Sequence, residues 1–323
     1  MTDVLILGGT GWLSGRIAQQ WLEAGARVTC LARGGRPAPD GARLVVADRT
    51  AADPYAAVSG HAWDEVVDIS SDPAAVAGAV DSIGARAAHY TYISSLSVYA
   101  RADVVGTDES APLAEPAQPG DEYDYARAKS AAEQAARTLG EKVAVVRPGL
   151  IVGPGDPTDR FGYWPARFAL AADEPVLVPA AEGLASQVID VDDVADFVVD
   201  AGATAWVGTV NAIAPTRPLA DTLATIRAVA GHTGQVVAAS PDQLLTHNVA
   251  YWAGPRSLPL WLPPDMPGFA THDGSAYRAA GGRIRPLEET VARVLTDERA
   301  RGLDRDRAAG LTRDDELAII AAL

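Results

Sequence analysis

The sequence predicts an α/β fold in which a doubly wound parallel sheet is combined with a smaller, interleaved C-terminal lobe. Short apolar runs alternate with helical patterns through the first 150 residues, and this alternation is typical of a parallel sheet with helices on both faces. A glycine-rich turn directly follows the first apolar run. After Pro148 the alternation loosens, and proline and glycine become frequent, which indicates a second lobe of different construction.

The elements of the first half are assigned from hydrophobic spacing. Residues 4–7 are entirely apolar, as a strand buried on both faces requires, and the turn after them leads into helical spacing over 17–24. In chain order, further strands are expected at 27–31, 44–46, 65–69, 90–94 and 143–146, and further helices at 73–83 and 123–139.

The second half is expected to return to the sheet before it ends in helices. Residues 186–199 and 209–214 are interpreted as strand-rich pieces. Amphipathic helices are predicted at 219–230 and 287–300, with a short final helix at 314–323. We therefore expect one domain over residues 1–155, completed by 186–215, and a smaller lobe with C-terminal helices formed mainly by 156–185 and 216–323.

Composition argues against several classes of function. The 323 residues carry a formal net charge of −15, which opposes binding to nucleic acid or to an anionic membrane, because both require clustered Lys and Arg. A single cysteine, Cys30, excludes an internal disulfide, and the five histidines lack metal-binding spacing, so we predict no metal. We see no leader peptide or membrane-spanning apolar run and expect a cytoplasmic protein that binds a small-molecule substrate.

The turn Gly8-Gly-Thr-Gly11 lies between the first strand and the first helix. Glycines at this position allow a tight turn and a close approach of the backbone to a pyrophosphate, which then lies on the helix N-terminus. The turn therefore predicts a dinucleotide-binding site in the domain at 1–155. The third glycine of the usual pattern is replaced by Ser14, which is small enough for close packing of the helix on the strand.

The end of the second strand bears on the choice of dinucleotide. An NAD site would place an acidic residue there to accept from the ribose 2′-hydroxyl, whereas this chain has Ala32 followed by Arg33 and Arg36. Arginines suit a 2′-phosphate, so we expect NADP(H) to be preferred over NAD(H). Asp48, at the end of the third strand, is placed to accept a hydrogen bond from the adenine amino group.

Tyr125 and Lys129 are four residues apart and therefore share one face of the predicted helix. A tyrosine has a reference pKa of about 10, and a nearby ammonium would favour the phenolate and lower that pKa, which suits proton exchange at neutral pH. Lys129 is one of only two lysines among 27 basic residues, and arginine could not do the same work.

Three serines, Ser94, Ser95 and Ser97, lie at the end of the strand at 90–94. The carboxyl edge of a parallel sheet faces the ligand crevice, so a hydroxyl at this place can orient a substrate carbonyl and stabilise its developing charge. Alternation along the strand does not choose among the three.

Taken together, these motifs resemble the extended short-chain dehydrogenase/reductases, a family of Rossmann-fold enzymes that includes NAD-dependent epimerases and dehydratases. The resemblance covers nearly the whole chain. A segment at 147–165 is similar to a bacterial branch described variously as reductases, isoflavone-reductase-like proteins or epimerase/dehydratases. The motifs that carry the resemblance are Gly8-Gly-Thr-Gly11, Ile93-Ser-Ser95-x-Ser-Val-Tyr99, Tyr125-x-x-x-Lys129 and Arg147-Pro-Gly-x-x-Val-Gly-Pro154, with later landmarks at 188–194 and 286–289.

The resemblance implies roles for individual residues. It selects Ser95 as the catalytic hydroxyl beside Tyr125 and Lys129, places 148–150 at the nicotinamide, and suggests a homodimer joined through the helices at 73–83 and 123–139. The expected cofactor contacts are Gly8, Thr10, Gly11, Trp12, Leu13, Arg33, Arg36, Asp48, Arg49, Ser70, Ser94, Lys129, Pro148 and Leu150.

Three functions are compatible with these residues. The first is a carbonyl reductase or alcohol dehydrogenase, in which NADPH provides the hydride, Tyr125 the proton and Ser95 the orientation of the substrate oxygen. The second is a nucleotide-sugar epimerase or dehydratase with tightly bound NAD, although a dehydratase would carry an Asp-Glu pair where this chain has Leu96-Ser97. The third, a non-catalytic nucleotide-binding protein, is disfavoured by the complete Ser/Tyr/Lys set and the acidic chain.

The substrate pocket is expected to be aromatic, which suits a ring-bearing or otherwise hydrophobic carbonyl compound, although the same side chains would also fill the core of the smaller lobe. Arginines in the second half keep a sugar-diphosphate substrate open, because a pyrophosphate requires paired arginines. The expected lining residues are Ser97, Arg160, Phe161, Tyr163, Trp164, Phe168, Trp252 and Trp261, and the further arginines are Arg167, Arg217 and Arg256.

Overall fold

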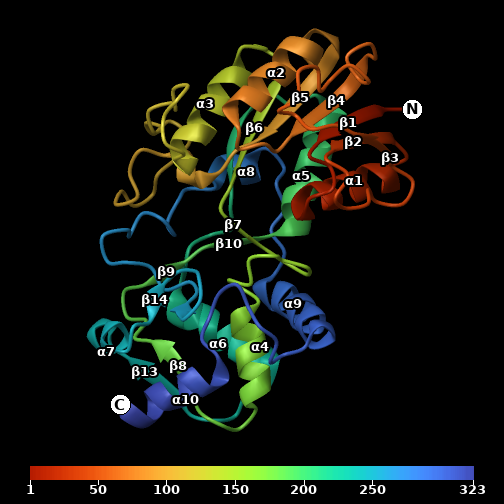
Figure 1. The fold of residues 1–323 in the computed structure, drawn as a ribbon. Helices are drawn as coiled ribbons and strands as arrows, with labels where there is room; N and C mark the ends of the chain where they lie inside the picture. Colours follow the sequence, from red (N-terminus) through yellow and green to blue (C-terminus); the bar gives the residue numbers. More distant parts are fainter.

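The computed structural model describes residues 1–323 and shows two lobes joined by short strands (Figure 1). The larger lobe is built on seven parallel strands in the order β11-β6-β5-β4-β1-β2-β3, which confirms the predicted doubly wound α/β fold. These strands are β1 (Asp3–Leu7), β2 (Arg27–Ala32), β3 (Arg43–Val46), β4 (Trp63–Asp68), β5 (Ala87–Ile93), β6 (Val143–Pro148) and β11 (Gly208–Ala212).

The strand order changes direction at β1. Strands β2 and β3 lie on one side of β1, and β4 to β6 lie on the other. The connections that leave the carboxyl ends of β1 and β4 therefore run in opposite directions and leave a crevice between them, which is where ligands bind in sheets of this kind.

Two helices cover each face of this sheet. Alternate residues of β1 enter opposite apolar layers, Val4 and Ile6 on one side and Leu5 and Leu7 on the other. Helices α1 (Trp12–Glu23) and α5 (Val191–Thr204) pack on the first face, and α2 (Pro73–Ile83) and α3 (Tyr125–Arg137) on the second (Figure 1).

The interpretation of 186–199 as strand-rich is wrong for most of that range. Only β9 (Ala185–Ser186) and β10 (Val188–Asp190) fall there, and neither pairs with the seven-stranded sheet. Strand β10 instead runs parallel to β7 (Leu150–Val152) between the two lobes. The expected strand at 209–214 is confirmed as β11, which is parallel to β6.

Local chemistry explains why a helix replaces the expected strand. The Asp190 side chain accepts a hydrogen bond from the Asp192 backbone N–H at 2.9 Å and so caps α5. Asp192 and Asp193 then lie in the first turn, where acidic side chains suit the positive end of the helix dipole. The apolar residues that follow recur at helical spacing and are buried: Val194, Ala195, Phe197, Val198 and Ala201.

Capping also sets the ends of the two helices that border the crevice. Helix α1 begins at Trp12, directly after Gly11, and so starts five residues before the expected range. Helix α3 begins at Tyr125, because the Asp124 side chain accepts from the Arg127 backbone N–H at 2.8 Å. This cap makes Tyr125 the first helical residue.

The smaller lobe has an apolar core of its own. Helices α4 (Tyr163–Ala171), α6 (Leu219–Ala230) and α9 (Leu287–Arg301) pack together, and β8 (Val176–Pro179) runs parallel to β13 (Val236–Ala239). The expected helices at 219–230, 287–300 and 314–323 are confirmed as α6, α9 and α10 (Arg313–Ala322). The remaining elements are short: β12 (Arg217–Pro218), α7 (Pro241–Thr246), β14 (Ala250–Tyr251), β15 (Ser257–Leu258), α8 (Ser275–Ala279) and two 3-10 turns, Gly84–Arg86 and Leu96–Val98.

None of the helices combines the length and apolar character needed to cross a membrane. No group of three or more His, Cys, Asp or Glu side chains is arranged to hold a metal ion.

Candidate active site

Two adjoining cavities occupy the crevice at the carboxyl edge of the sheet. The larger, of about 890 Å³, lies against the glycine turn and the ends of β2 and β3. The smaller, of about 440 Å³, lies between the end of β5 and the second lobe. Trp12, Leu13, Ile69 and Ser71 line both cavities, so the two form one cleft long enough to hold two linked groups.

The glycine turn requires glycine at two positions. Gly8 has a φ of +89°, a conformation that residues with a Cβ rarely adopt. A Cβ on Gly9 would lie 2.6 Å from the Cys30 Sγ, which is closer than any normal contact. The turn therefore keeps its backbone bare where it meets α1, as close approach of a pyrophosphate requires.

Ser14, which replaces the third glycine of the usual pattern, braces this turn. Its hydroxyl donates to the Gly8 carbonyl at 2.6 Å and accepts from the Gly11 backbone N–H at 3.0 Å. The departure from glycine thus adds two hydrogen bonds within the turn and leaves the cavity open. Because the braced turn leaves its backbone exposed to the larger cavity, the residues of this cavity fit a dinucleotide.

The far end of the larger cavity carries the residues expected at the adenosine. Arg33 and Arg36 line it and are exposed to solvent. Asp48 lines it as well, with its carboxylate accepting from the backbone N–H of Thr50 at 3.0 Å and from the Thr50 hydroxyl at 2.8 Å. These two hydrogen bonds hold the pKa of Asp48 below its usual value, so its carboxylate stays an acceptor at neutral pH.

Arg49 was expected to contact the cofactor, but its guanidinium is already engaged within the fold. It donates to both carboxylate oxygens of Asp68, at 2.7 and 2.6 Å, and to the hydroxyl of Tyr55 at 2.8 Å. A further bond reaches the Ala75 carbonyl. Arg49 borders the cavity, but its donors hold the end of β4 against α2 and are not free to bind a phosphate.

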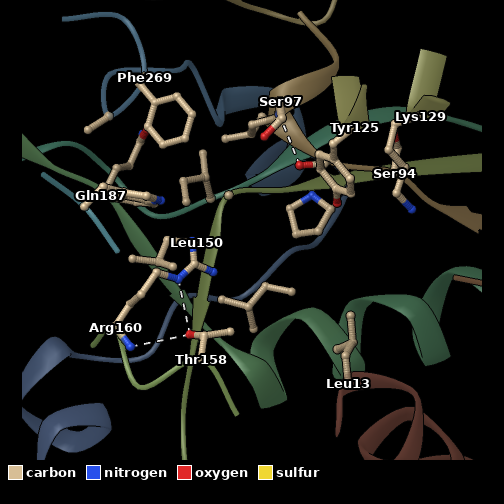
Figure 2. A pocket seen from close by; sticks show the side chains of 18 of the residues that line it. Leu13, Ser94, Ser97, Tyr125, Lys129, Leu150, Thr158, Arg160, Gln187 and Phe269 are labelled. Carbon is tan, nitrogen blue, oxygen red and sulfur yellow. Dashed lines mark hydrogen bonds between the residues drawn. The ribbon is translucent and has the colours of Figure 1, made fainter. Parts of the chain in front are cut away.

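Tyr125 points into the smaller cavity from the start of α3 (Figure 2). The residue is 43% exposed at the cavity mouth. Burial of its phenol against the cavity wall raises the pKa of Tyr125, and the neighbouring Ser95 hydroxyl opposes that rise. Tyr125 is therefore a protonated phenol at neutral pH, with its oxygen accessible to a ligand.

Lys129 lies one turn further along α3 and is 3% exposed. Its Nζ donates to three backbone carbonyls at the ends of β4 and β5: Ile93 at 2.7 Å, Ser70 at 3.0 Å and Ile69 at 3.3 Å. Burial lowers the pKa of Lys129 to about 8. Because all three N–H groups are taken, the ammonium does not bond to Tyr125, and the expected lowering of the Tyr125 pKa by Lys129 is not found.

The three serines differ in their surroundings. Ser94 is 3% exposed at the strand end and also borders the cavity. The Ser95 hydroxyl accepts from the Ser97 backbone N–H at 3.1 Å and so caps the short turn that follows β5. Ser95 and Ser97 both line the cavity, but only Ser95 acts on the pKa of Tyr125. The Ser95 and Tyr125 side chains thus line the same cavity.

The other walls of the smaller cavity are mostly apolar. Pro148 and Leu150 border it at the end of β6 and in β7, and loops of the second lobe add apolar side chains that the sequence did not single out. No periodic pattern marks those loops, so nothing in the sequence pointed to them. They are Leu260, Leu262 and Phe269, together with the expected Trp252, while Ile213 reaches the cavity from the end of β11.

One result now decides the family. The model of the NAD dependent epimerase/dehydratase family matches residues 4–210, which is more than half of the chain. The chain belongs to this family. The resemblance to the extended short-chain dehydrogenase/reductases is therefore confirmed, and with it an enzyme family that uses a nicotinamide dinucleotide. A search of curated proteins found no match.

Solved structures of similar fold include several epimerases. A candidate epimerase from Burkholderia cenocepacia is 20% identical, with a TM-score of 0.73 over 93% of this chain and 98% of that one. UDP-glucose 4-epimerase from Thermotoga maritima, solved with UDP-glucose, is 16% identical, with a TM-score of 0.67 over 93% and 99%. The Thermus thermophilus UDP-glucose 4-epimerase, in complex with NAD, is 16% identical, with a TM-score of 0.65 over 93% and 100%. At these identities the likeness shows the fold.

Most of the aromatic residues expected in the pocket of this family member lie elsewhere. They fill the core of the smaller lobe. Tyr163, Trp164 and Phe168 belong to α4, which packs on α6 and β8, and the Trp164 indole N–H donates to the Pro259 carbonyl at 2.8 Å. Trp252 alone lines the cavity. The residues placed in the core are Phe161, Tyr163, Trp164, Phe168 and Trp261, each at most 1% exposed.

The four arginines considered for a sugar-diphosphate substrate also lie in different places. Arg167 donates to the Leu311 carbonyl and pairs with the buried Glu316. Arg256 pairs with Asp315 on the surface, and Arg217 borders a different cavity beside α9. Arg160 is the one that lines the smaller cavity. The paired arginines that a pyrophosphate would require are therefore not brought together.

Proposed function

We propose that this protein is an NADP(H)-dependent oxidoreductase that reduces the carbonyl group of a small, hydrophobic or ring-bearing metabolite, or oxidises the corresponding alcohol. One observation carries the proposal. The hydroxyls of Ser95 and Tyr125 line the smaller, mostly apolar cavity, and this cavity adjoins the larger one that lies against the glycine turn. A carbonyl compound in that cavity would have two hydroxyl donors for its oxygen.

The dinucleotide would be held by the glycine turn, by Arg33 and Arg36 at its 2′-phosphate, and by residues 148–150 at its other end. When bound, it supplies the hydride for reduction or accepts one in oxidation. Every other part of the chemistry falls to the protein. Most residues that line the cavity are apolar, and such surroundings strengthen the hydrogen bonds made to the reacting oxygen.

Ser95 and Tyr125 divide the work on that oxygen. Ser95 donates a hydrogen bond that orients the carbonyl and stabilises the negative charge that develops on it. Tyr125 then gives up its phenolic proton. A raised pKa keeps this phenol protonated at neutral pH, as a proton donor must be, which favours the direction of reduction.

Lys129 supports the site by holding the strand ends in place. Its ammonium is fixed by the three carbonyls at the ends of β4 and β5 and lines the same cavity as Tyr125. The pKa of Tyr125 carries no contribution from Lys129. Lys129 therefore positions the end of β5, where Ser95 follows, and does not tune the tyrosine.

The test follows the oxidation of NADPH at 340 nm with a panel of ring-bearing ketones and aldehydes. We expect turnover with at least one member, and its loss in Tyr125→Phe. Tyr123→Phe is the matched control, because it removes the same atom from a tyrosine that is 71% exposed and two residues away. Absence of turnover across the panel, or near-normal turnover in Tyr125→Phe, would contradict the proposal.

A second candidate is a nucleotide-sugar epimerase or dehydratase that retains NAD. The fold likeness to UDP-glucose 4-epimerases supports it, whereas the scattered arginines oppose it. Mass spectrometry of the purified protein separates the two functions. Co-purified NAD, together with thermal stabilisation by UDP and none by the ketones, would establish the epimerase reading.

A further inference from the structure

Arg160 brings a positive charge to the smaller cavity and forms no direct ion pair, although the buried Asp156 carboxylate acts on its charge from beyond ion-pair distance. It lies in the loop between β7 and α4, and Figure 2 shows its side chain on the side of the cavity opposite Ser97 and Tyr125. Its hydrogen bonds within the chain go to the hydroxyl of Thr158, from Nε at 3.2 Å and from the backbone N–H at 3.5 Å. The two terminal nitrogens of the guanidinium are free.

The acidic residues nearest in the chain are engaged with other partners. Asp159 has a φ of +58°, and its carboxylate turns away to Arg301 and Arg305 and to the Ala308 backbone N–H at 2.9 Å. Asp156 accepts from the Thr158 backbone N–H at 2.8 Å and from its hydroxyl at 3.0 Å. The loop is thus held from both sides, and Asp156 is linked to Arg160 only through the Thr158 hydroxyl, which leaves the two terminal nitrogens of Arg160 without a direct partner.

The unpaired charge sits in partly apolar surroundings. Trp252 places its ring 5.2 Å from the Arg160 guanidinium carbon, and Phe269 packs edge-on against that indole at 5.1 Å. A ring face attracts a cation but does not neutralise it. An arginine in a protein stays charged, and a partly desolvated charge favours binding of an opposite charge. The cavity therefore offers one anion-binding group beside an aromatic wall.

We infer that Arg160 binds a carboxylate of the substrate, and that the substrate is a ring-bearing oxo acid or the hydroxy acid formed from it. The inference rests on the proposed oxidoreductase function and adds the substrate class to it. A planar guanidinium with two free nitrogens matches a carboxylate in a bidentate pair. One arginine suits one carboxylate. Trp252 and Phe269 suit an apolar ring. Ser95 and Tyr125 lie across the cavity, where they would donate hydrogen bonds to the substrate carbonyl.

The experiment measures binding apart from turnover. The protein is saturated with NADP⁺, which cannot reduce a ketone, and is titrated by calorimetry with three acids of different length, each paired with its methyl ester. The acids are benzoylformate, 4-oxo-4-phenylbutanoate and 4-acetylbenzoate. We expect at least one acid to bind about tenfold or more tightly than its ester, since a hydrogen bond to a charged group contributes that much or more. This comparison needs no variant.

Variants then assign the preference to Arg160. In Arg160→Gln the affinity for the acid should fall about tenfold to a hundredfold, while the ester and NADP⁺ bind as before. Arg160→Lys should retain part of the preference, because it keeps the charge but loses the planar fork. Arg217→Gln is the matched control, as it removes an exposed arginine that borders the separate cavity beside α9.

Three results would overturn the inference. The first is equal binding of acid and ester for every pair. The second is an acid preference that survives in Arg160→Gln, and the third is a large loss of NADP⁺ affinity in that variant, which would make Arg160 a cofactor residue. If UDP bound through Arg160 more tightly than any of the acids, the group that Arg160 recognises would be a phosphate and not a carboxylate. If acids bind through Arg160 but no probe consumes NADPH, the oxidoreductase proposal fails while the anion site stands.

Discussion

Lys129 offers a test of the electrostatics of the site through stability. Its ammonium is buried, and burial lowers its pKa to about 8 from the 10.5 of an exposed lysine. Below pH 8 both folded and unfolded chains carry the charge, and the folded chain bears the cost of burying it. Between pH 8 and 10.5 the unfolded chain binds more protons than the folded one, so stability rises with pH in that window.

The size of the effect follows from these two pKa values. For a group with a pKa of about 8 in the folded chain and 10.5 in the unfolded chain, the linkage relation gives about 1 kcal/mol of added stability between pH 7 and pH 9. Lys129→Met removes this contribution and leaves a side chain of similar length. The free energy of unfolding of the wild type should therefore rise relative to that of Lys129→Met by about 1 kcal/mol over this range.

The assay is urea unfolding of both proteins at pH 7, 8 and 9, followed by circular dichroism. Comparison of the two proteins cancels the other groups that titrate in this range. Lys142→Met controls for the loss of a lysine, because Lys142 also donates to two carbonyls, those of Gly84 and Ala87, but remains partly exposed. A constant difference between wild type and Lys129→Met, or a difference that shrinks as the pH rises, would refute the reasoning.

Two further predictions concern the dinucleotide. Arg33→Asp should lower the affinity for NADPH relative to NADH by about tenfold or more, because a charge-assisted contact to phosphate contributes about 1.5–3 kcal/mol; equal affinities of the wild type for both, measured by calorimetry, would count against NADP(H). Gly9→Ala should weaken dinucleotide binding at least about tenfold by pressing a Cβ against Cys30, whereas Gly15→Ala, where a Cβ meets nothing within 4 Å, should bind normally. A functional Gly9→Ala protein would show that the turn is less constrained than its geometry indicates.

Much of the fold could be predicted because the larger lobe repeats one local pattern. A buried parallel strand such as β1 is apolar on both faces, and this makes it visible in the sequence. Helix α5 was not predicted, because it lies outside that repeated pattern. Its start, with Asp190, Asp192 and Asp193, was read as part of a family landmark, although an acidic cap before an apolar run at helical spacing is a helix signal.

The candidate site was predictable where the motif fixes the backbone. The glycine turn, and the presence of Ser95 and Tyr125 in one cavity, follow from strand and helix ends whose place in the fold is set by topology. The partners of a charged side chain are not set in this way. Lys129 and Arg49 both find partners within the fold, carbonyl oxygens and Asp68, that lie distant in sequence.

The substrate cavity was the least predictable part. An aromatic residue serves a core and a pocket equally well, and only the packing of α4 shows that Tyr163 and Trp164 belong to the core. Phe269 reaches the cavity from a loop without periodicity. The free charge of Arg160 depends on Asp159 being held by arginines more than 140 residues later, a relation that no local pattern reveals.

The transfer of deuterium from the cofactor tests the central claim most directly. NADPH labelled with deuterium at C4, in each of its two configurations, is supplied with a ketone that the protein consumes, and the alcohol is analysed by mass spectrometry. The account predicts one deuterium on the carbinol carbon from one of the two labelled cofactors, in the wild type and in Tyr123→Phe but not in Tyr125→Phe. An alcohol without deuterium from either cofactor, or undiminished transfer in Tyr125→Phe, would contradict it.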